Sequence, residues 1–163
     1  MNQTLKEIKN KIYQPCFFQI TNYKKEEEGQ EYDACQFELN GLKLISRTAK
    51  ITPKKVGQFV TFWKRNNEKI TAPYDETDEF QFYIINVKKG NQLGQFVFPK
   101  SVLIQKGIVT TKTKDGKRGF RVYPSWDNAT SKQAIKTQKW QLNYFYEVND
   151  ETNFSFVKER YSY

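Results

Sequence analysis

The sequence contains no histidine at any of its 163 positions. This absence removes the usual general base, the usual nitrogen ligand for zinc and every catalytic triad built on imidazole. The nucleotide-binding patterns GxxxxGK[ST] and GxGxxG are absent as well. The hydrolytic chemistry that remains is metal-dependent phosphodiester cleavage, in which carboxylates hold a divalent ion and a lysine supports the attacking water.

Cleavage of this kind requires an acid and a lysine two residues apart on one face of a strand. The sequence has Asp/Glu-x-Lys only at Glu7–Lys9, in an expected helix, and at Asp115–Lys117, in an expected turn. We therefore expect no intact catalytic set, no metal site and no cofactor. If the protein is nevertheless a nuclease, its site would consist of Glu38, Lys50, Asp78 and Glu79. In the simpler interpretation, Glu38 forms an ion pair with Arg47 or Lys50 across a hairpin.

The net charge of +9 is concentrated in two segments. Residues 47–69 carry seven basic side chains and one acidic side chain, and residues 100–139 carry ten basic and two acidic side chains. Such clustering is expected of a surface that contacts phosphate groups and releases their counterions. The alternative is a basic surface that serves only solubility.

Aromatic residues lie next to the basic ones in the second segment. On an extended strand, Arg118 and Phe120 share one face while Arg121 and Tyr123 share the other. Arginine beside an aromatic ring can hold a phosphate and stack a base at once. The candidates for base stacking are Trp63, Tyr123, Trp126 and Trp140. The alternative is that the tryptophans are core residues.

The elements that must position these residues begin with a short helix over residues 3–12, with Thr4 as its expected cap. Residues 23–34 form a polar charge run, which we interpret as a loop without chemistry. The clearest local pattern lies in residues 35–49, where two alternating apolar runs flank Asn40-Gly41. This dipeptide favours the type I′ turn of a tight hairpin.

A helix is expected to follow over residues 52–63, because Thr52 can cap it and Pro53 suits its first position. Apolar residues then recur at helical spacing. The N-terminus of this helix, with Lys54 and Lys55, would form an anion site. A plain capped helix with exposed lysines is the alternative.

The second half of the chain alternates strands and helices. Residues 80–87 and 94–98 are predicted to be paired central strands, and residues 99–106 a helix that ends at Gly107. Asp115-Gly116 indicates another hairpin. A last helix, capped by Thr130 or Ser131, is predicted because apolar and other core-type residues recur at helical spacing: Ala134, Ile135, Gln138, Leu142 and Phe145.

This order of elements predicts an α/β protein with a mixed sheet flanked by helices, and the length favours one domain with one core. No stretch approaches the roughly 18 apolar residues of a membrane span, and the first residues lack the apolar segment of a signal peptide. We therefore expect a cytoplasmic protein without membrane contact. Cys16 and Cys35 are expected to be free thiols.

Several strings of this sequence resemble, in order, those of the MepB family, small bacterial proteins named after a member encoded beside a multidrug efflux pump. The strings are CQFELNGLK, RTAKITPKKVGQFVTFWKR, FYIINV, GQFVFPKSVL, GKRGFRVYP and KTQKWQLNYF. The resemblance is strongest over residues 35–145 of a single domain spanning 1–163, and residues 146–163 are interpreted as a C-terminal extension. It implies a fold similar to type II restriction endonucleases, without a complete nuclease motif.

The resemblance also implies binding to DNA with little sequence preference, and to nucleosides as further ligands. The implied nucleic-acid-binding residues are Arg47, Lys50, Lys54, Lys55, Lys117, Arg118, Arg121, Lys136 and Lys139. We therefore predict a non-catalytic, sequence-nonspecific DNA-binding protein that is a monomer or a weak dimer, with purine nucleosides as additional candidate partners. The alternatives are a metal-dependent nuclease with a degraded carboxylate site, and an accessory protein that binds a nucleoside, another small molecule or an acidic protein.

Overall fold

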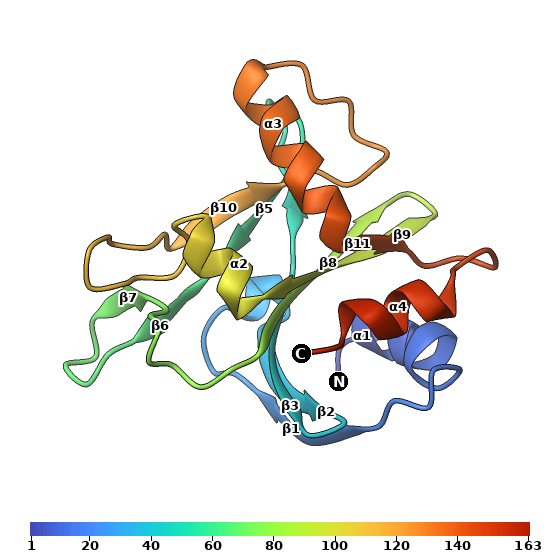
Figure 1. Ribbon diagram of the computed structural model, residues 1–163, viewed down its shortest axis with the longest axis horizontal. Coiled ribbons are helices and arrows are strands. Elements are labelled where there is room, and N and C mark those ends of the chain that lie inside the picture. Colours follow the sequence, from blue (N-terminus) through green and yellow to red (C-terminus); the bar gives the residue numbers. More distant parts are fainter.

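A six-stranded mixed sheet forms the centre of the computed structural model, which describes residues 1–163 (Figure 1). In spatial order, its strands are β1 (Ile20–Lys25), β2 (Cys35–Leu39), β3 (Leu42–Thr48), β8 (Phe82–Lys89), β9 (Gln92–Pro99) and β11 (Phe145–Glu147). All neighbours are antiparallel except β3 and β8, which run parallel. The predicted mixed sheet is confirmed.

Helices flank both faces of this sheet, as predicted. They are α1 (Gln3–Ile8), which continues as a π-helix over Lys9–Tyr13, α2 (Lys100–Gln105), α3 (Lys132–Gln141) and α4 (Phe154–Arg160), with short 3-10 helices at Gln30–Tyr32 and Leu142–Tyr144. Residues of α1 and α4 join one buried apolar cluster, and residues of α2 and α3 join or pack against the other. Because successive strand residues point to opposite faces, β8 places Phe82 in the first cluster and Tyr83 in the second. The molecule therefore has two apolar layers, where the sequence led us to expect one core.

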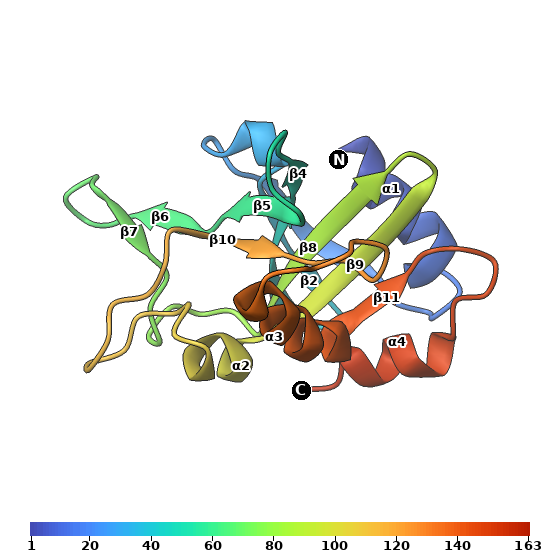
Figure 2. The same ribbon diagram turned by 90° about the horizontal axis from the view of Figure 1, so that it is seen from above.

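Two smaller sheets complete the fold. One contains β4 (Lys50–Ile51), β5 (Gln58–Thr61) and β10 (Gly119–Val122), and the other is the hairpin of β6 (Trp63–Arg65) and β7 (Thr71–Pro73). The β6–β7 hairpin extends away from the large sheet at one end of the molecule (Figure 2).

The local sequence signals at several turns and caps are confirmed. Asn40 and Gly41 connect β2 to β3 with φ angles of 50° and 82°, the left-handed pair that a type I′ turn requires. β8 and β9 pair along their whole length. α2 ends before Gly107, whose φ is 71°. Ser131 caps α3, because its Oγ accepts a hydrogen bond of 3.1 Å from the N–H of Ala134.

The helix predicted over residues 52–63 is wrong. The segment instead forms β5 and the start of β6, after a turn in which Gly57 has a φ of 83°. Alternate residues Gln58, Val60 and Phe62 are buried, which is the two-residue period of a strand. The decisive contacts are not local, since β5 pairs with β10, about 60 residues further along the chain.

Four smaller predictions also need correction. Asn2, not Thr4, caps α1 through a 2.8 Å bond from the N–H of Leu5. The predicted loop over 23–34 begins inside β1. Asp115-Gly116 does not form a hairpin, because β10 pairs with β5 instead. The last helix ends at Gln141, so Leu142 lies in a 3-10 helix and Phe145 in β11, where the pairing with β9 replaces the predicted helix.

The C-terminal segment belongs to the core of the fold. Tyr161, which follows α4, is 5% exposed, and its hydroxyl lies 2.7 Å from that of Tyr13. The side-chain oxygen of Gln95 accepts hydrogen bonds from Tyr146 and Tyr161 and lies 3.3 Å from the hydroxyl of Tyr13, while its amide group donates to Asn86 at 2.7 Å. Burial raises the pKa of each of these tyrosines. This buried polar cluster joins α1, the central sheet and α4.

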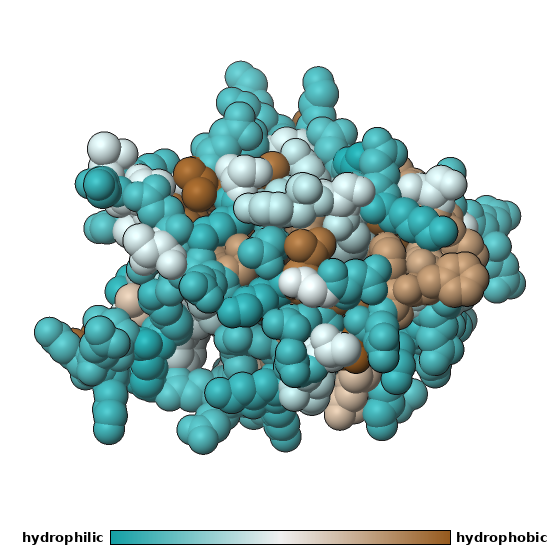
Figure 3. All heavy atoms as spheres, turned by 60° about the horizontal axis from the view of Figure 1, so that its bottom comes forward, coloured by the Kyte–Doolittle hydropathy of each residue, from teal (hydrophilic) through white to brown (hydrophobic).

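The two cysteines form no disulfide bond. Cys16 and Cys35 are free and buried, and burial raises the pKa of Cys35 to about 11. None of the helices combines the length and the apolar character needed to traverse a lipid bilayer. Hydrophilic residues dominate the face shown in Figure 3, and its larger apolar areas lie toward one side.

Candidate nucleic-acid interface

A basic cavity lies between β10, α3 and the end of α2. We call it the α3–β10 cavity. It has a volume of about 370 Å³, and its lining residues include Lys106, Lys117, Arg121, Phe120, Tyr123 and Trp140. No acidic side chain lines it. The cavity therefore combines three cations with three aromatic rings.

Two glutamines of α3 hold this helix against β10. Gln141 is fully buried, accepts a 2.9 Å hydrogen bond from the N–H of Tyr123 and donates one of 2.9 Å to the carbonyl of Arg121. Gln138 donates to the carbonyls of Pro124 and Asp127, each at 2.9 Å. Buried amides satisfied in this way fix geometry strongly, because any displacement leaves polar groups unpaired.

The aromatic wall of the cavity is partly core and partly accessible. Trp140 packs against Phe98 with ring centroids 5.4 Å apart, and the ammonium of Lys106 lies 5.1 Å from the centroid of the Trp140 ring.

At Gly119, an added Cβ would approach a ring atom of Phe59 to 2.6 Å. Glycine at this position thus allows β10 to pack closely on β5.

Arg121 of β10 and Arg118, which directly precedes β10, also hold neighbouring parts of the backbone in place. Arg121 donates to Thr52 Oγ1 at 2.5 Å and to the carbonyl of Val56 at 3.3 Å, so it holds the turn between β4 and β5. Arg118 is exposed and donates to the carbonyl of Thr71 in β7 at 3.2 Å. Substituting either arginine therefore changes local structure as well as charge.

The other predicted binding residues do not line this cavity. Lys136 and Lys139 are exposed on α3. Lys54, Lys55 and Trp126 line a separate cavity of about 620 Å³. The two lysines belong to a turn and not to a helix, so the predicted anion site at a helix N-terminus does not exist. Lys50 lies over the ring of Tyr32, 4.8 Å from its centroid.

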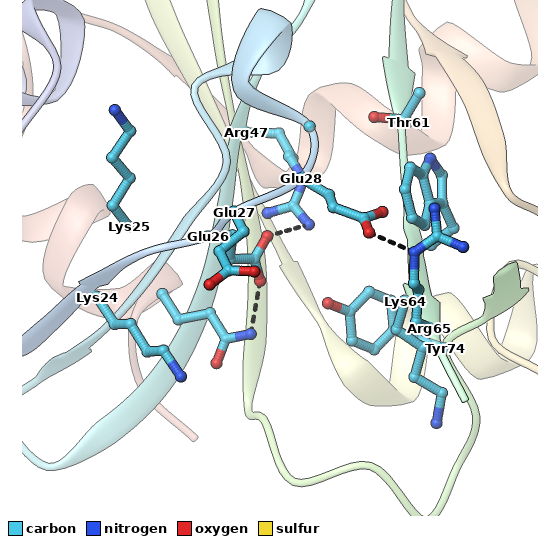
Figure 4. A pocket seen from close by; sticks show the side chains of 13 residues that line it. Lys24, Lys25, Glu26, Glu27, Glu28, Arg47, Thr61, Lys64, Arg65 and Tyr74 are labelled. Atoms are coloured by element: carbon cyan, nitrogen blue, oxygen red, sulfur yellow. Dashed lines mark hydrogen bonds and ion pairs between the residues drawn. The ribbon is translucent and has the colours of Figure 1, made fainter. Parts of the chain in front are cut away.

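A second charged site, which we call the Arg47 cleft, has a volume of about 480 Å³ (Figure 4). It contains both Arg47 and Trp63 from the sequence prediction, and its lining residues are Lys24, Lys25, Glu26, Glu27, Glu28, Gly29, Gln36, Arg47, Thr61, Trp63, Lys64, Arg65 and Tyr74. Arg47 is only 3% exposed, and its Nη2 lies 2.5 Å from Glu26 Oε2. Burial raises the pKa of Tyr74 to about 12.

The acidic residues considered for catalysis do not converge. Glu38 accepts a 2.7 Å hydrogen bond from Asn22, so the predicted ion pair with Arg47 or Lys50 is wrong. Asp78 pairs with Lys64 at 2.7 Å, and Glu79 pairs with Lys43 at 3.1 Å. No group of three or more cysteine, aspartate and glutamate side chains is arranged to hold a metal ion.

Asp75 anchors the β6–β7 hairpin through an ion pair with Lys64 of β6. It accepts a 2.8 Å hydrogen bond from the N–H of Thr77 and pairs with Lys64 at 3.0 Å, and its pKa is lowered to about 2 by the Thr77 side chain and by Lys64. Because the folded pKa is depressed, this stabilisation is present above about pH 4 and is lost as the pH falls toward 2. The difference in Tm between wild type and Asp75→Asn should therefore shrink from pH 4 to 2.

Thermal unfolding followed by circular dichroism measures this difference. Glu76→Gln provides the control, because Glu76 is exposed and forms no ion pair, so its Tm should stay close to that of wild type. A difference for Asp75→Asn that persists unchanged at pH 2 would contradict the assignment.

Sequence reasoning missed four contributors to these sites. Lys106 and Gln141 were assigned no role because nothing in the sequence links α2 and α3 to β10. Glu26 and Glu28 were dismissed as part of a charge run, although three consecutive acids in a basic chain were a visible signal.

Comparisons with known proteins identify a matching family model and two solved structures that align with this chain. A family model described as MepB-like matches residues 26–147. The crystal structure of MepB superposes with a TM-score of 0.80 and 35% sequence identity, over 93% of this chain and 100% of that chain. The bacterial homing endonuclease I-Ssp6803I aligns with a TM-score of 0.42 and 17% identity, over 85% of this chain and 82% of that chain, which is too distant to carry an argument. No curated protein matches.

Proposed function

This chain belongs to the MepB-like family, and on that premise we propose that it binds DNA through the sugar-phosphate backbone, with little sequence preference and without cleaving it. The observation that carries the proposal is the α3–β10 cavity, in which Lys106, Lys117 and Arg121 converge without an acidic neighbour. Such a concentration of unpaired positive charge favours a polyanion, because binding releases the counterions of the phosphates.

Aromatic rings beside these cations support nucleic acid over other polyanions. Phe120, Tyr123 and Trp140 line the same cavity, and base–aromatic stacking is worth about 1–3 kcal/mol per base. The exposed lysines of α3 extend the basic surface beyond the cavity. Contacts of this kind position a nucleic acid but do not read its sequence, so specificity is expected to be low.

The absence of cleavage is supported by how the acidic residues are used. Glu38, Asp78 and Glu79 each have a separate partner on the protein, and Lys50 lies over Tyr32. A nuclease of the carboxylate type needs such groups within reach of one divalent ion.

Replacing both Lys106 and Lys117 with alanine should weaken binding to labelled duplex DNA about tenfold or more. Both side chains are exposed and form no ion pair, so the fold should be unaffected. The slope of log affinity against log salt concentration should fall by about 1 for each lysine. Fluorescence anisotropy across a salt series measures both quantities.

The matched control is Lys6→Ala combined with Lys9→Ala, which removes the same charge from the region of α1. Equal losses in the two double variants would show that only total charge matters and would refute a localised interface. Magnesium is included in parallel samples that are then run on a gel. Magnesium-dependent products that disappear in Glu38→Ala would instead establish the nuclease.

Nucleosides are a second candidate class of ligand, because the α3–β10 cavity has the size of a small-molecule site and three aromatic rings. Saturable quenching of tryptophan fluorescence by adenosine or guanosine, without any DNA affinity, would favour this function over the first.

A further inference from the structure

Two arginines of the Arg47 cleft, Arg47 and Arg65, are already paired with an acidic segment of the same chain. We propose that in the free protein Glu28 occupies the position that a nucleic-acid phosphate takes in the complex, while Glu26 holds the acidic segment in place. Binding of nucleic acid then displaces Glu28 and frees Arg65. The acidic segment would then restrict access to a second phosphate-binding site. This inference rests on the proposed function and adds its regulation.

The geometry of the cleft matches this exchange. Glu26 and Glu28 follow β1 on one wall, whereas Arg47 belongs to β3 and Arg65 to β6 (Figure 4). Glu26 pairs with Arg47, and Glu28 pairs with the Nε of Arg65. Guanidinium groups bind carboxylate and phosphate oxygens with the same fork of N–H donors, so either anion fits the same position.

The two pairs differ in how readily they can exchange. The side chains of Arg47 and Glu26 are only 4% and 17% exposed, and Gln36 donates a further 2.6 Å hydrogen bond to Glu26. The side chains of Arg65 and Glu28 are 46% and 43% exposed. An exposed pair contributes little to stability, whereas a buried pair is costly to break. Glu28 is therefore the residue that exchanges, and Glu26 keeps the segment in place.

Further groups around Arg65 favour a nucleic acid as the displacing ligand. The guanidinium of Arg65 lies 5.6 Å from the ring centroid of Trp63, which also lines the cleft. Lys24 and Lys25 line it as well and have no ion-pair partner. Release of Arg65 would thus expose a cation next to two free lysines and an aromatic ring that can stack a base.

Glu28→Gln tests the exchange in the full-length chain, again with labelled duplex DNA across a salt series. Affinity at low salt should rise about fivefold, because a phosphate no longer has to displace Glu28 from Arg65 before it can bind there. Glu27→Gln is the matched control, since Glu27 lines the same cleft and makes no ion pair. It changes the net charge equally, and its affinity at low salt should stay close to that of wild type.

A combined Glu28→Gln and Arg65→Ala variant should lose the gain in affinity, and its salt slope should be about 0.9 smaller than that of Glu28→Gln, because the phosphate contact of Arg65 is gone. If Glu27→Gln and Glu28→Gln behave alike while wild type binds DNA, the exchange is refuted and the proposed function stands. If none of these proteins binds DNA at low salt, the proposed function fails, and the exchange fails with it. Binding by Glu28→Gln but not by wild type would support the exchange directly.

Discussion

Replacing Tyr161 with alanine should lower the free energy of unfolding by about 4 kcal/mol, the typical cost of deleting a buried aromatic side chain. Tyr161 makes edge-on contacts with Tyr13, Phe18 and Phe82, with ring centroids 5.5–5.9 Å apart. Its loss also removes one hydroxyl from the cluster around Gln95. Domains are commonly stable by only 5–15 kcal/mol, so this change removes a large share.

Urea unfolding followed by tyrosine and tryptophan fluorescence measures this effect. Tyr161→Phe separates the ring from the hydroxyl, because it keeps the packing and should cost only about 1–2 kcal/mol. Equal losses for the two variants would mean that the hydrogen bonds, and not the ring contacts, hold α4 in place.

Replacing Arg47 with methionine should destabilise the protein by about 3 kcal/mol, because it leaves the carboxylate of Glu26 largely buried without its counterion. Arg47 also donates a 2.8 Å hydrogen bond to the carbonyl of Ser46, which this variant removes. The effect should appear as a lower urea midpoint with an unchanged m-value.

The double variant Arg47→Met, Glu26→Gln should recover more than half of that loss, because neither charge then remains in the cleft. With wild type and the single variant Glu26→Gln, these proteins form a double-mutant cycle that isolates the interaction between the two side chains. A double variant that is as unstable as Arg47→Met would show that packing of the arginine, and not its charge, determines the stability.

The parts of the fold that could be predicted from the sequence are those specified by short-range chemistry. Asn40-Gly41 supplies two left-handed residues, Gly107 ends α2, and Ser131 caps α3, so each feature depends on one or two side chains and the adjacent backbone. The central β8–β9 hairpin was equally clear, because its strands are long, apolar and adjacent in sequence.

The predictions failed where contacts between residues far apart in the sequence determine the structure. The pattern after Pro53 fits a helix and a strand about equally, and only pairing with β10 selects the strand. The same limit applies to the sites. Basic and aromatic residues were identified by type, but the convergence of Lys106 with Lys117 depends on how α2 meets β10. The pairing of Glu28 with Arg65 joins residues 37 positions apart.

The hydrogen bond between Tyr13 and Tyr161 has a consequence for how the chain folds, because it joins residues 148 positions apart. Contacts of such high sequence separation pay a large loop-closure entropy before they contribute energy. The hairpins β2–β3 and β8–β9 involve only local contacts, so they can form early, while the layer beneath α1 and α4 closes late. Until it does, an apolar face of the central sheet stays open to other chains, and aggregation during refolding should increase steeply with protein concentration.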